Sequence, residues 1–314
     1  MVMVCLSIFN RLHYEVFRFR NCFKLVLVVF CGDYLTVKIE LIGLSSIPEV
    51  RAGDDVGRLI YEALQREGVG IRDGDIIVIT HKIVSKANGL IIDLSSVTPS
   101  ERAVEIGKMT GKDPRFVEVI LREAKRILYV RPPFIITETH FGHVCLNAGV
   151  DRSNVAGSEE ICALLPRDPD EEAKKIRNRL IELCGFRKIA VVISDTYSRP
   201  HRYAQIDMAI GISGLNPVVN YRGRTDAYGY RLRFKMQAVG DEFAAAAELV
   251  IGQTIERTPV VIIRGYNWEL DEGSSAKQMS LIKLGYKCIF EGVSIVPEKP
   301  GISKRSDLDD WGIT

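Results

Sequence analysis

The sequence predicts an α+β protein with mixed and antiparallel sheets and flanking helices. Strand-like and helix-like segments are interspersed, but they do not follow the regular strand–helix alternation of a doubly wound sheet. Several predicted strands are joined by short polar links, which favours antiparallel neighbours. The chain has 314 residues, of which 46% are hydrophobic and 26% charged, an ordinary composition for one large domain or two smaller ones.

Strands are predicted from short apolar runs that alternate with polar residues or are bounded by turn residues. In chain order they cover residues 37–44, 73–80, an extended segment within 89–94, 132–139, 188–194 and 258–265. The lysine-bearing segment 81–88 (HKIVSKAN) is predicted as a loop between two of them.

Helices are predicted where a capping residue precedes an apolar pattern of helical period. Thr98, Pro99 and Glu101 form a capping box. The segment 168–185 begins acidic, becomes basic and ends in Gly185, as the helix dipole and a glycine C-cap favour. The predicted helices are 55–65 (capped by Asp54 or Asp55), 99–110, 114–128 (after Asp113), 169–184, 240–253 and 272–285.

The global properties exclude several classes of partner. The net charge of +2 gives no indication of nucleic acid or a membrane surface. The longest apolar run, residues 25–31, is far shorter than the roughly 20 residues that a membrane helix needs. The seven cysteines form no CxxC pair, so we expect reduced thiols in a cytoplasmic protein.

Residues 1–36 differ from the rest of the chain. Basic residues precede a short apolar run, which is one pattern of a secretory signal, but Glu15 interrupts the basic region and CGDYL is a poor cleavage site. An appended segment, or a start assigned too far upstream, is the alternative that we favour. We therefore expect an N-terminal extension at 1–36 and a main domain at 37–314, which could divide into two subdomains.

Short motifs argue against several common chemistries. The chain has no GxxxxGK[ST] and no GxSxG, and GVGIRDG has the wrong spacing for a dinucleotide fingerprint. His140 and His143 form an HxxH with no acidic residue between them, which fits loop histidines better than a zinc pair.

Three polar segments, each placed after a predicted strand, remain. The first gathers small polar residues around Asp151, which suits a turn or the oxygen ligation of a hard cation. The second presents Asp195 and Thr196 at a strand end, followed by Arg199, His201 and Arg202, which could neutralise phosphate or carboxylate oxygens. The third carries Lys82 and Lys86 on either side of a strand-to-loop transition, and Lys86 could act as a point charge for phosphate. Any one of them alone is more often a surface loop, but together they favour a nucleotide and metal site.

Seven segments in one order resemble the coenzyme F420-0 gamma-glutamyl ligase family. They are HKIVSKANG, ETHFGHVCLNAGVDRSNV, ISDTYSRPHR, QIDMAIGISGL, NYRGRTDAYG, DEFAAAAELVIGQ and PVVIIRG. The resemblance is collinear from about Val37 to at least Gly265 and does not include residues 1–36.

The resemblance implies a ligase that uses GTP to join L-glutamate to coenzyme F420-0 and then adds a second glutamate through a gamma linkage. It also implies two divalent cations (Mn²⁺ or Mg²⁺), K⁺, and a family-specific α+β fold in an intertwined homodimer. The expected route is phosphoryl transfer from GTP to the acceptor carboxylate, followed by attack of the glutamate amine on the acyl phosphate with release of GDP and phosphate.

The resemblance also assigns site residues. Asp151 and Asp195 match positions that bind one divalent cation, and Thr196 and Gln253 match positions for the other. The positions that match nucleotide contacts are Ser46, Ile47, Pro48, Glu49, His81, Lys86, Asn154, Ile251, Gly252, Gln253, Thr254, Ile255, Glu256, Arg257 and Thr258. Arg199 and Arg202 are our own hypothesis for holding a substrate carboxylate or phosphate.

One loop departs from the family pattern. After Ser-Asp-Thr the family sequence is closer to Phe-Gly-Arg-Pro-Trp-Arg, whereas this chain has Tyr197, Ser198, Arg199, Pro200, His201 and Arg202. The substrate pocket could therefore differ. Two alternatives stay open: a related nucleotide-dependent amide ligase acting on a different acid, and a non-catalytic protein, either a GTP- and metal-binding protein or a structural dimer.

Overall fold

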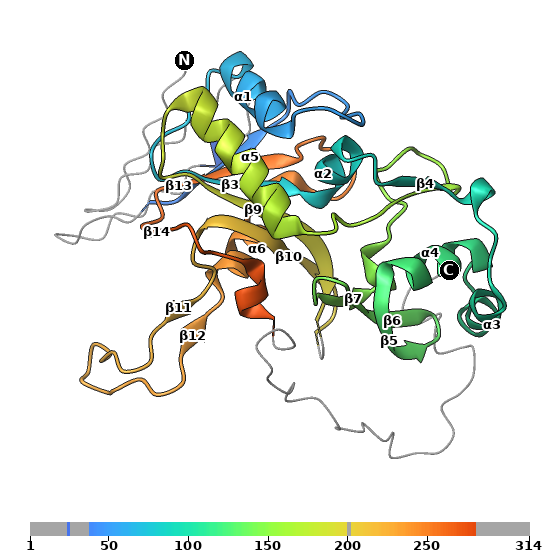
Figure 1. Cartoon of the computed structure of the whole chain (residues 1–314). Coiled ribbons are helices and arrows are strands. Elements are labelled where there is room, and N and C mark those ends of the chain that lie inside the picture. Colours follow the sequence, from blue (N-terminus) through green and yellow to red (C-terminus); the bar gives the residue numbers. More distant parts are fainter. Residues whose placement is uncertain (1–23, 26–37, 200–201, 281–314) are drawn as a thin grey trace, which may run out of the picture.

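The structure is a computed structural model and describes residues 24–25, 38–199 and 202–280. A seven-stranded sheet forms its centre, in the order β1-β2-β13-β3-β9-β10-β14 (Figure 1). Within it β3 and β9 pair in parallel and the other neighbours are antiparallel. The strands are β1 (Lys24–Leu25), β2 (Glu40–Leu44), β3 (Ile76–Thr80), β9 (Ala190–Ser198), β10 (Gln205–Leu215), β13 (Val260–Arg264) and β14 (Leu270–Asp271).

Both faces of this sheet are covered by helices. α1 (Val56–Arg66) and α5 (Pro169–Cys184) pack on one face, and α6 (Val239–Ile251) packs on the other (Figure 1). Side chains alternate along a strand, so Ile77 and Ile79 of β3 face the first layer while Ile76 and Val78 face the second. A strand buried on both faces is continuously apolar, as the segment IIVIT is.

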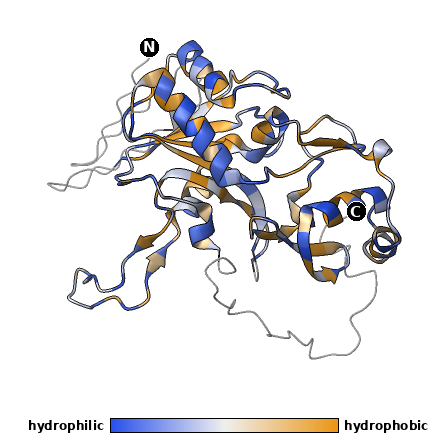
Figure 2. Cartoon of the chain, in the orientation of Figure 1, coloured by the Kyte–Doolittle hydropathy of each residue, from blue (hydrophilic) through white to orange (hydrophobic). Residues whose placement is uncertain are grey.

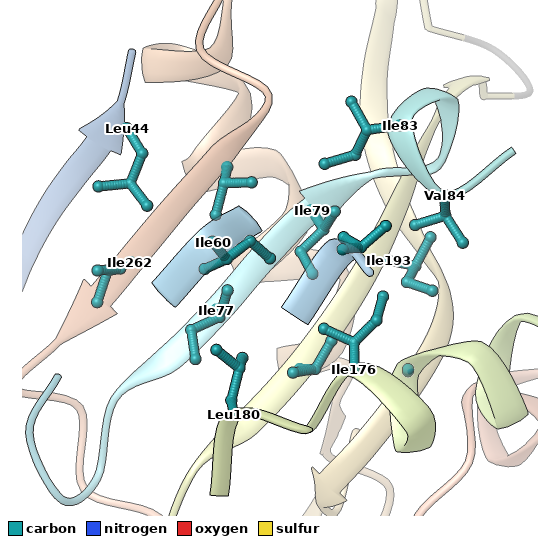
Figure 3. Packing of buried hydrophobic residues seen from close by; sticks show 14 of the residues in the cluster. Leu44, Ile60, Ile77, Ile79, Ile83, Val84, Ile176, Leu180, Ile193 and Ile262 are labelled. Carbon is teal, nitrogen blue, oxygen red and sulfur yellow. The ribbon is translucent and has the colours of Figure 1, made fainter. Parts of the chain in front are cut away.

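The first of these layers is a dense aliphatic core. Ile60 of α1 and Leu180 of α5 are fully buried against Ile77 of the sheet (Figure 3). Each such side chain contributes about 1.5–3 kcal/mol when it is removed from water. Colouring by hydropathy shows the same arrangement, with apolar strands inside and hydrophilic outer faces on α1 and α5 (Figure 2).

Residues 90–164 form a second region with its own core. Its helices are α3 (Glu101–Thr110) and α4 (Pro114–Glu123), and two short 3-10 helices lie at Leu94–Ser96 and Asn147–Gly149. β4 (Ile91–Asp93) pairs with β8 (Ile161–Ala163), while β5 (Ala124–Arg131), β6 (Phe134–Thr139) and β7 (Val144–Leu146) form a small antiparallel sheet. A further hairpin, based on β11 (Val219–Asn220) and β12 (Met236–Gln237), projects from the central body (Figure 1).

The mixed α+β architecture is confirmed, with several sheets and helices α1 to α6 within the described ranges. Several local predictions were wrong, and two of them concern the segments 81–88 and 114–128. The segment predicted as a loop after β3 is the helix α2 (His81–Ala87), which buries Ile83 and Val84 against the first core layer (Figure 3). The helix predicted to run to about Leu128 ends at Glu123, and the chain continues as β5.

Tertiary pairing explains the second difference. β5 pairs with β6, and the fully buried Glu138 of β6 accepts hydrogen bonds from Lys125 and Arg126 of β5. A buried carboxylate needs such partners, and only an extended segment next to β6 brings both cations to it. Local helix signals cannot report this long-range requirement.

The predicted caps are largely confirmed. Asp55, Asp113 and Asp168 accept hydrogen bonds from the first turns of their helices, and Gly185 ends α5 in the left-handed conformation. The helix predicted from Thr98 instead begins at Glu101 and is capped by Ser100. The helix predicted at 272–285 is a 3-10 turn, Ala276–Met279, and its part beyond residue 280 lies outside the described residues.

No helix of the described ranges is long and apolar enough to cross a membrane. The homodimer and the boundary between residues 1–36 and 37–314 stay predictions. Of the predicted extension, the described residues Lys24 and Leu25 pair with Ile42 and Leu41 of β2.

Candidate functional site

A hollow of about 580 Å³ lies where β3 ends and β9 continues. The parallel pairing of β3 with β9 stops at Thr80 and Ser194, and α2 starts at His81, directly after β3. From Asp195 to Ser198, the only strand that pairs with β9 in the described part of the chain is β10. The polar end of β9 therefore borders an opening instead of a neighbouring strand.

The two adjacent residues Asp195 and Thr196 lie on opposite faces of β9. Asp195 lies on the same face of β9 as Val191 and Ile193, and its Oδ1 lies 3.3 Å from Nε2 of the buried His81. That contact does not have hydrogen-bond geometry, so Nε2 is a buried nitrogen without a partner. Thr196 lies on the same face as Val192, and its hydroxyl donates a hydrogen bond of 3.0 Å to Asp207 on β10.

Asp207 anchors a polar network beside Thr196. Its carboxylate accepts from the Ser194 and Thr196 hydroxyls, and its backbone N–H donates to Oε2 of Glu248 on α6. The other oxygen of Glu248 accepts from Nε2 of Gln253 at 2.9 Å. Burial raises the pKa of Asp207 and the Glu248 carboxylate adds to the rise, while the Ser194 hydroxyl opposes it.

This network fixes which atoms face the hollow. The Gln253 amide places its N–H₂ on Glu248, which leaves its carbonyl oxygen as the group available to a ligand. The Thr196 hydroxyl donates its hydrogen to Asp207, so it can only accept from, or coordinate to, other groups. Two neutral oxygens are thereby oriented as acceptors.

Asp151 is held differently. It does not line this hollow, and its carboxylate accepts from Lys82 Nζ at 2.7 Å and from the hydroxyl and the backbone N–H of Ser153. Burial alone would raise the pKa of Asp151, but Lys82 and Ser153 together hold it below its ordinary value. Lys82 itself lines the hollow, so the Asp151–Lys82 pair stands at its rim.

Most of the residues matched to nucleotide contacts line the hollow. Lys86 pairs with Glu49 there, and the Asn154 amide donates to the backbone oxygen of Gln253 at 3.0 Å, tying two lining loops together. Gly252 permits the turn into this loop, because it has a φ of 68° and a Cβ would clash with the Glu256 side chain. The matched residues in the lining are Ile47, Pro48, Glu49, His81, Lys86, Asn154, Asp195, Thr196, Ile251, Gly252, Gln253, Thr254, Ile255, Glu256, Arg257 and Thr258.

Four predicted residues are not in the lining: Ser46, Asp151, Arg199 and Arg202. The backbone of Ser46 is bound by Glu67 and Arg66 behind the wall of the hollow. Arg199 and the exposed Arg202 belong to the turn between β9 and β10, where Arg199 contacts the backbone oxygen of Ala204. His201 lies outside the described residues.

Comparison with known proteins places this geometry in a family. The family model described as F420-0:Gamma-glutamyl ligase matches residues 45–265, which includes every described element that lines the hollow. The chain belongs to the F420-0:gamma-glutamyl ligase family.

Proteins named Coenzyme F420:L-glutamate ligase are similar over most of their length. The protein from Methanothermobacter thermautotrophicus is 50% identical over 230 residues, which cover 73% of this chain and 90% of the relative. The one from Methanopyrus kandleri is 46% identical over 240 residues, covering 76% and 91%. The one from Methanocaldococcus jannaschii is 42% identical over 236 residues, covering 75% and 91%. This family member is therefore an enzyme of the ligase class.

Sequence reasoning missed two residues of the polar network beside Thr196. Asp207 lies in the segment QIDMAIGISGL, to which no role was assigned, and Glu248 lies within a helix that was predicted only as packing. The polar Asp207 in an apolar strand was a usable signal. Its meaning depends on the register that sets it opposite Thr196.

The donor set fits hard cations. Asp195, Thr196 and Gln253 offer a carboxylate, a hydroxyl and an amide oxygen, which are ligand types that Mg²⁺ and Mn²⁺ accept. In the described ranges no group of three His, Cys, Asp or Glu side chains is arranged to hold a metal ion. A cation here would therefore complete its coordination with water and phosphate oxygens, as Mg²⁺ at nucleotide sites does. His140 is exposed, and the ring of His143 stacks on Phe141.

Proposed function

We propose that this protein is a GTP-dependent amide ligase of coenzyme F420 biosynthesis. It adds L-glutamate to coenzyme F420-0 and then a gamma-linked glutamate to the first product. One observation supports this most: a single hollow gathers the carboxylate, hydroxyl and amide of the cation residues with the lysine and loop residues matched to nucleotide contacts. The relatives named Coenzyme F420:L-glutamate ligase supply the choice of substrates.

In the proposed reaction the acceptor carboxylate attacks the γ-phosphorus of GTP and GDP leaves. The glutamate amine then attacks the carbonyl carbon of the acyl phosphate and forms the amide bond. Phosphate leaves and carries one oxygen of the original carboxylate. Phosphoryl transfer depends mainly on positioning and on neutralising phosphate oxygens. Divalent cations supply part of that charge when bound, and K⁺ is a further expected cation.

The protein's own residues have defined tasks. Asp195 and Thr196 point to opposite faces of β9, so they serve two different cations, with Gln253 beside Thr196. Lys82 and Lys86 are four residues apart on α2, and each pairs with a carboxylate at the rim. When Lys82 exchanges Asp151 for a phosphate oxygen, the Asp151 carboxylate becomes free to bind a cation.

GDP release in the presence of Mn²⁺ tests this function. We expect release that requires both F420-0 and L-glutamate. Release with another acid in place of F420-0 would support the alternative, a related amide ligase with a different acceptor, which the altered Tyr197–Arg202 loop keeps open. No release under any of these conditions would contradict the ligase proposal. A cytoplasmic homodimer is the expected working form.

A further inference from the structure

A second hollow, of about 370 Å³, lies on the other side of the Asp151–Lys82 pair. Its wall joins the end of α3, the start of α4 and the loop that carries Asp151 and Arg152. None of the residues matched to nucleotide contacts lines it. Asp151 lines this hollow and its partner Lys82 lines the first one, so the two hollows meet at a single ion pair.

The charges in this second hollow are unbalanced. Its two carboxylates, Asp113 and Asp151, are each paired at 2.7 Å with a cation outside the lining, Arg115 and Lys82. Its two cations are Lys112 and Arg152. Among the described residues Arg152 forms an ion pair only with Glu159, whose side chain is 89% exposed, and such a pair contributes little. Lys112 has no carboxylate within ion-pair distance in the described parts of the chain.

Lys112 donates no side-chain hydrogen bond within the described ranges, and one donor of Arg152 is also without an acceptor. Arg152 Nε is buried and has no partner, and its guanidinium lies 4.3 Å above the Phe116 ring, which fixes its plane. Burial lowers the pKa of Lys112, and the positive charge of Arg152 lowers it further. Two like charges in a half-buried hollow with an unused donor are what a bound anion would satisfy.

Two further features agree with an anion. Asp113 and Phe116 belong to the first turn of α4, so the positive end of that helix dipole is part of the wall. Asn147 Oδ1 is buried there without a partner, and its amide can turn to present N–H₂ to an acceptor.

We propose that this hollow is an oxyanion subsite in which Lys112 and Arg152 hold a phosphate or carboxylate group of the acid acceptor or of L-glutamate. The class of ligand follows from the geometry, while its identity as a ligase substrate rests on the proposed function. A substrate held there by its charged group reaches past Asp151 toward the first hollow, where the nucleotide is expected.

Steady-state kinetics of Lys112→Met test the subsite. The variant keeps an apolar stem and removes the charge. Lys108→Met is the matched control, because it removes an equal charge from an exposed position on α3, the helix that ends just before Lys112. We expect the KM for F420-0 or for L-glutamate to rise about ten-fold, as the loss of a charged hydrogen bond implies, with kcat retained and the KM for GTP unchanged. The KM that rises identifies which substrate supplies the anion.

The conservative variant and a direct binding measurement complete the test. Lys112→Arg should keep the affected KM near the wild-type value. Inorganic phosphate should raise the Tm of the wild type and of Lys108→Met by more than that of Lys112→Met. Unchanged KM values in Lys112→Met, a rise for GTP alone, or equal phosphate stabilisation of all three proteins would overturn the subsite. If the wild type makes no product from F420-0 and glutamate, the proposed function fails, and the phosphate measurement still decides the subsite.

Discussion

Asp195 and Asp151 are matched to one cation, yet the structure holds them in different ways. Asp195 sits on a strand of the central sheet, accepts the Thr196 backbone N–H at 2.8 Å, and has His81 as its only ion-pair neighbour in the described ranges. Asp151 is bound by Lys82 and by two hydrogen bonds from Ser153. The Asp195 carboxylate is therefore available to a ligand, whereas the Asp151 carboxylate is already paired with Lys82.

Of the two carboxylates of the proposed cation site, only Asp195 is therefore placed to bind a cation without a rearrangement of its ion pairs. Asp195 is fixed by the pairing of β9 with β10, so its position does not depend on a ligand. Asp151 can bind a cation only when Lys82 moves away or shares it. Under the proposed function we therefore expect Asp195 to control the affinity for the cation and Asp151 to respond when the cation binds.

The largest expected effect comes from Asp195→Asn. Losing the charge of a cation ligand should lower kcat by at least about 100-fold, while the fold is kept because Asp195 has no lysine or arginine partner in the described ranges. GDP release and thermal unfolding measure the two effects. Activity within two-fold of the wild type would show that Asp195 is not a cation ligand.

Glu248→Gln should have the next largest effect. The Gln253 amide loses the acceptor that orients it, so affinity for the second cation should fall about 10-fold to 100-fold. Electron paramagnetic resonance of Mn²⁺ titrated without nucleotide measures this directly. Glu242→Gln is the control, because Glu242 lies on the same helix and its carboxylate accepts from Gln237 outside the hollow. Equal Mn²⁺ affinity in both variants would contradict the orienting role.

Lys82→Met tests the pairing of Asp151 through the free energy of unfolding. The folded pKa of Asp151 is lowered, so its pairing stabilises the protein above the ordinary pKa of an aspartate and is lost as pH falls through the folded value. Because the pair is partly exposed, the variant should lose about 0.5–1 kcal/mol at pH 7. Urea unfolding at pH 7 and near pH 3 should show the loss shrinking with acidity, and a loss independent of pH would contradict it.

The smallest effect is expected for Arg202→Ala. Arg202 is exposed and outside the lining, so every KM should change by less than about two-fold if its position in the structure holds during catalysis. The hypothesis from the sequence, that it holds a substrate anion, predicts a clear rise in one KM. Michaelis constants for the three substrates decide between them.

Local signals predicted the fold well where they coincide with burial. The run Ile76–Thr80 and the acidic-to-basic pattern of α5 are consistent with their surroundings in the sheet and on its surface. They failed at Ala124–Arg131, where buried Glu138 requires an extended partner, and at His81–Ala87, where apolar contacts with the core favour a helix.

Which side chains come together in the first hollow was predictable to a similar extent, while their roles as ligands stay predictions. Asp195, Thr196 and Lys86 stand out because they directly follow apolar runs, and the parallel pairing of β3 and β9 brings them together. Asp207 and Glu248 could not be assigned roles, because these depend on the β9–β10 register and on the placement of α6. The Lys82–Asp151 pair spans two regions of the chain that no local pattern connects.

Product mass tests the central claim most directly. The wild type and Asp195→Asn are incubated with F420-0, GTP, L-glutamate and Mn²⁺, and the products are weighed by mass spectrometry. The account predicts that the wild type adds one or two glutamate residues with matching GDP, and that Asp195→Asn adds almost none. Unchanged F420-0 with the wild type, or equal product from both proteins, would contradict it.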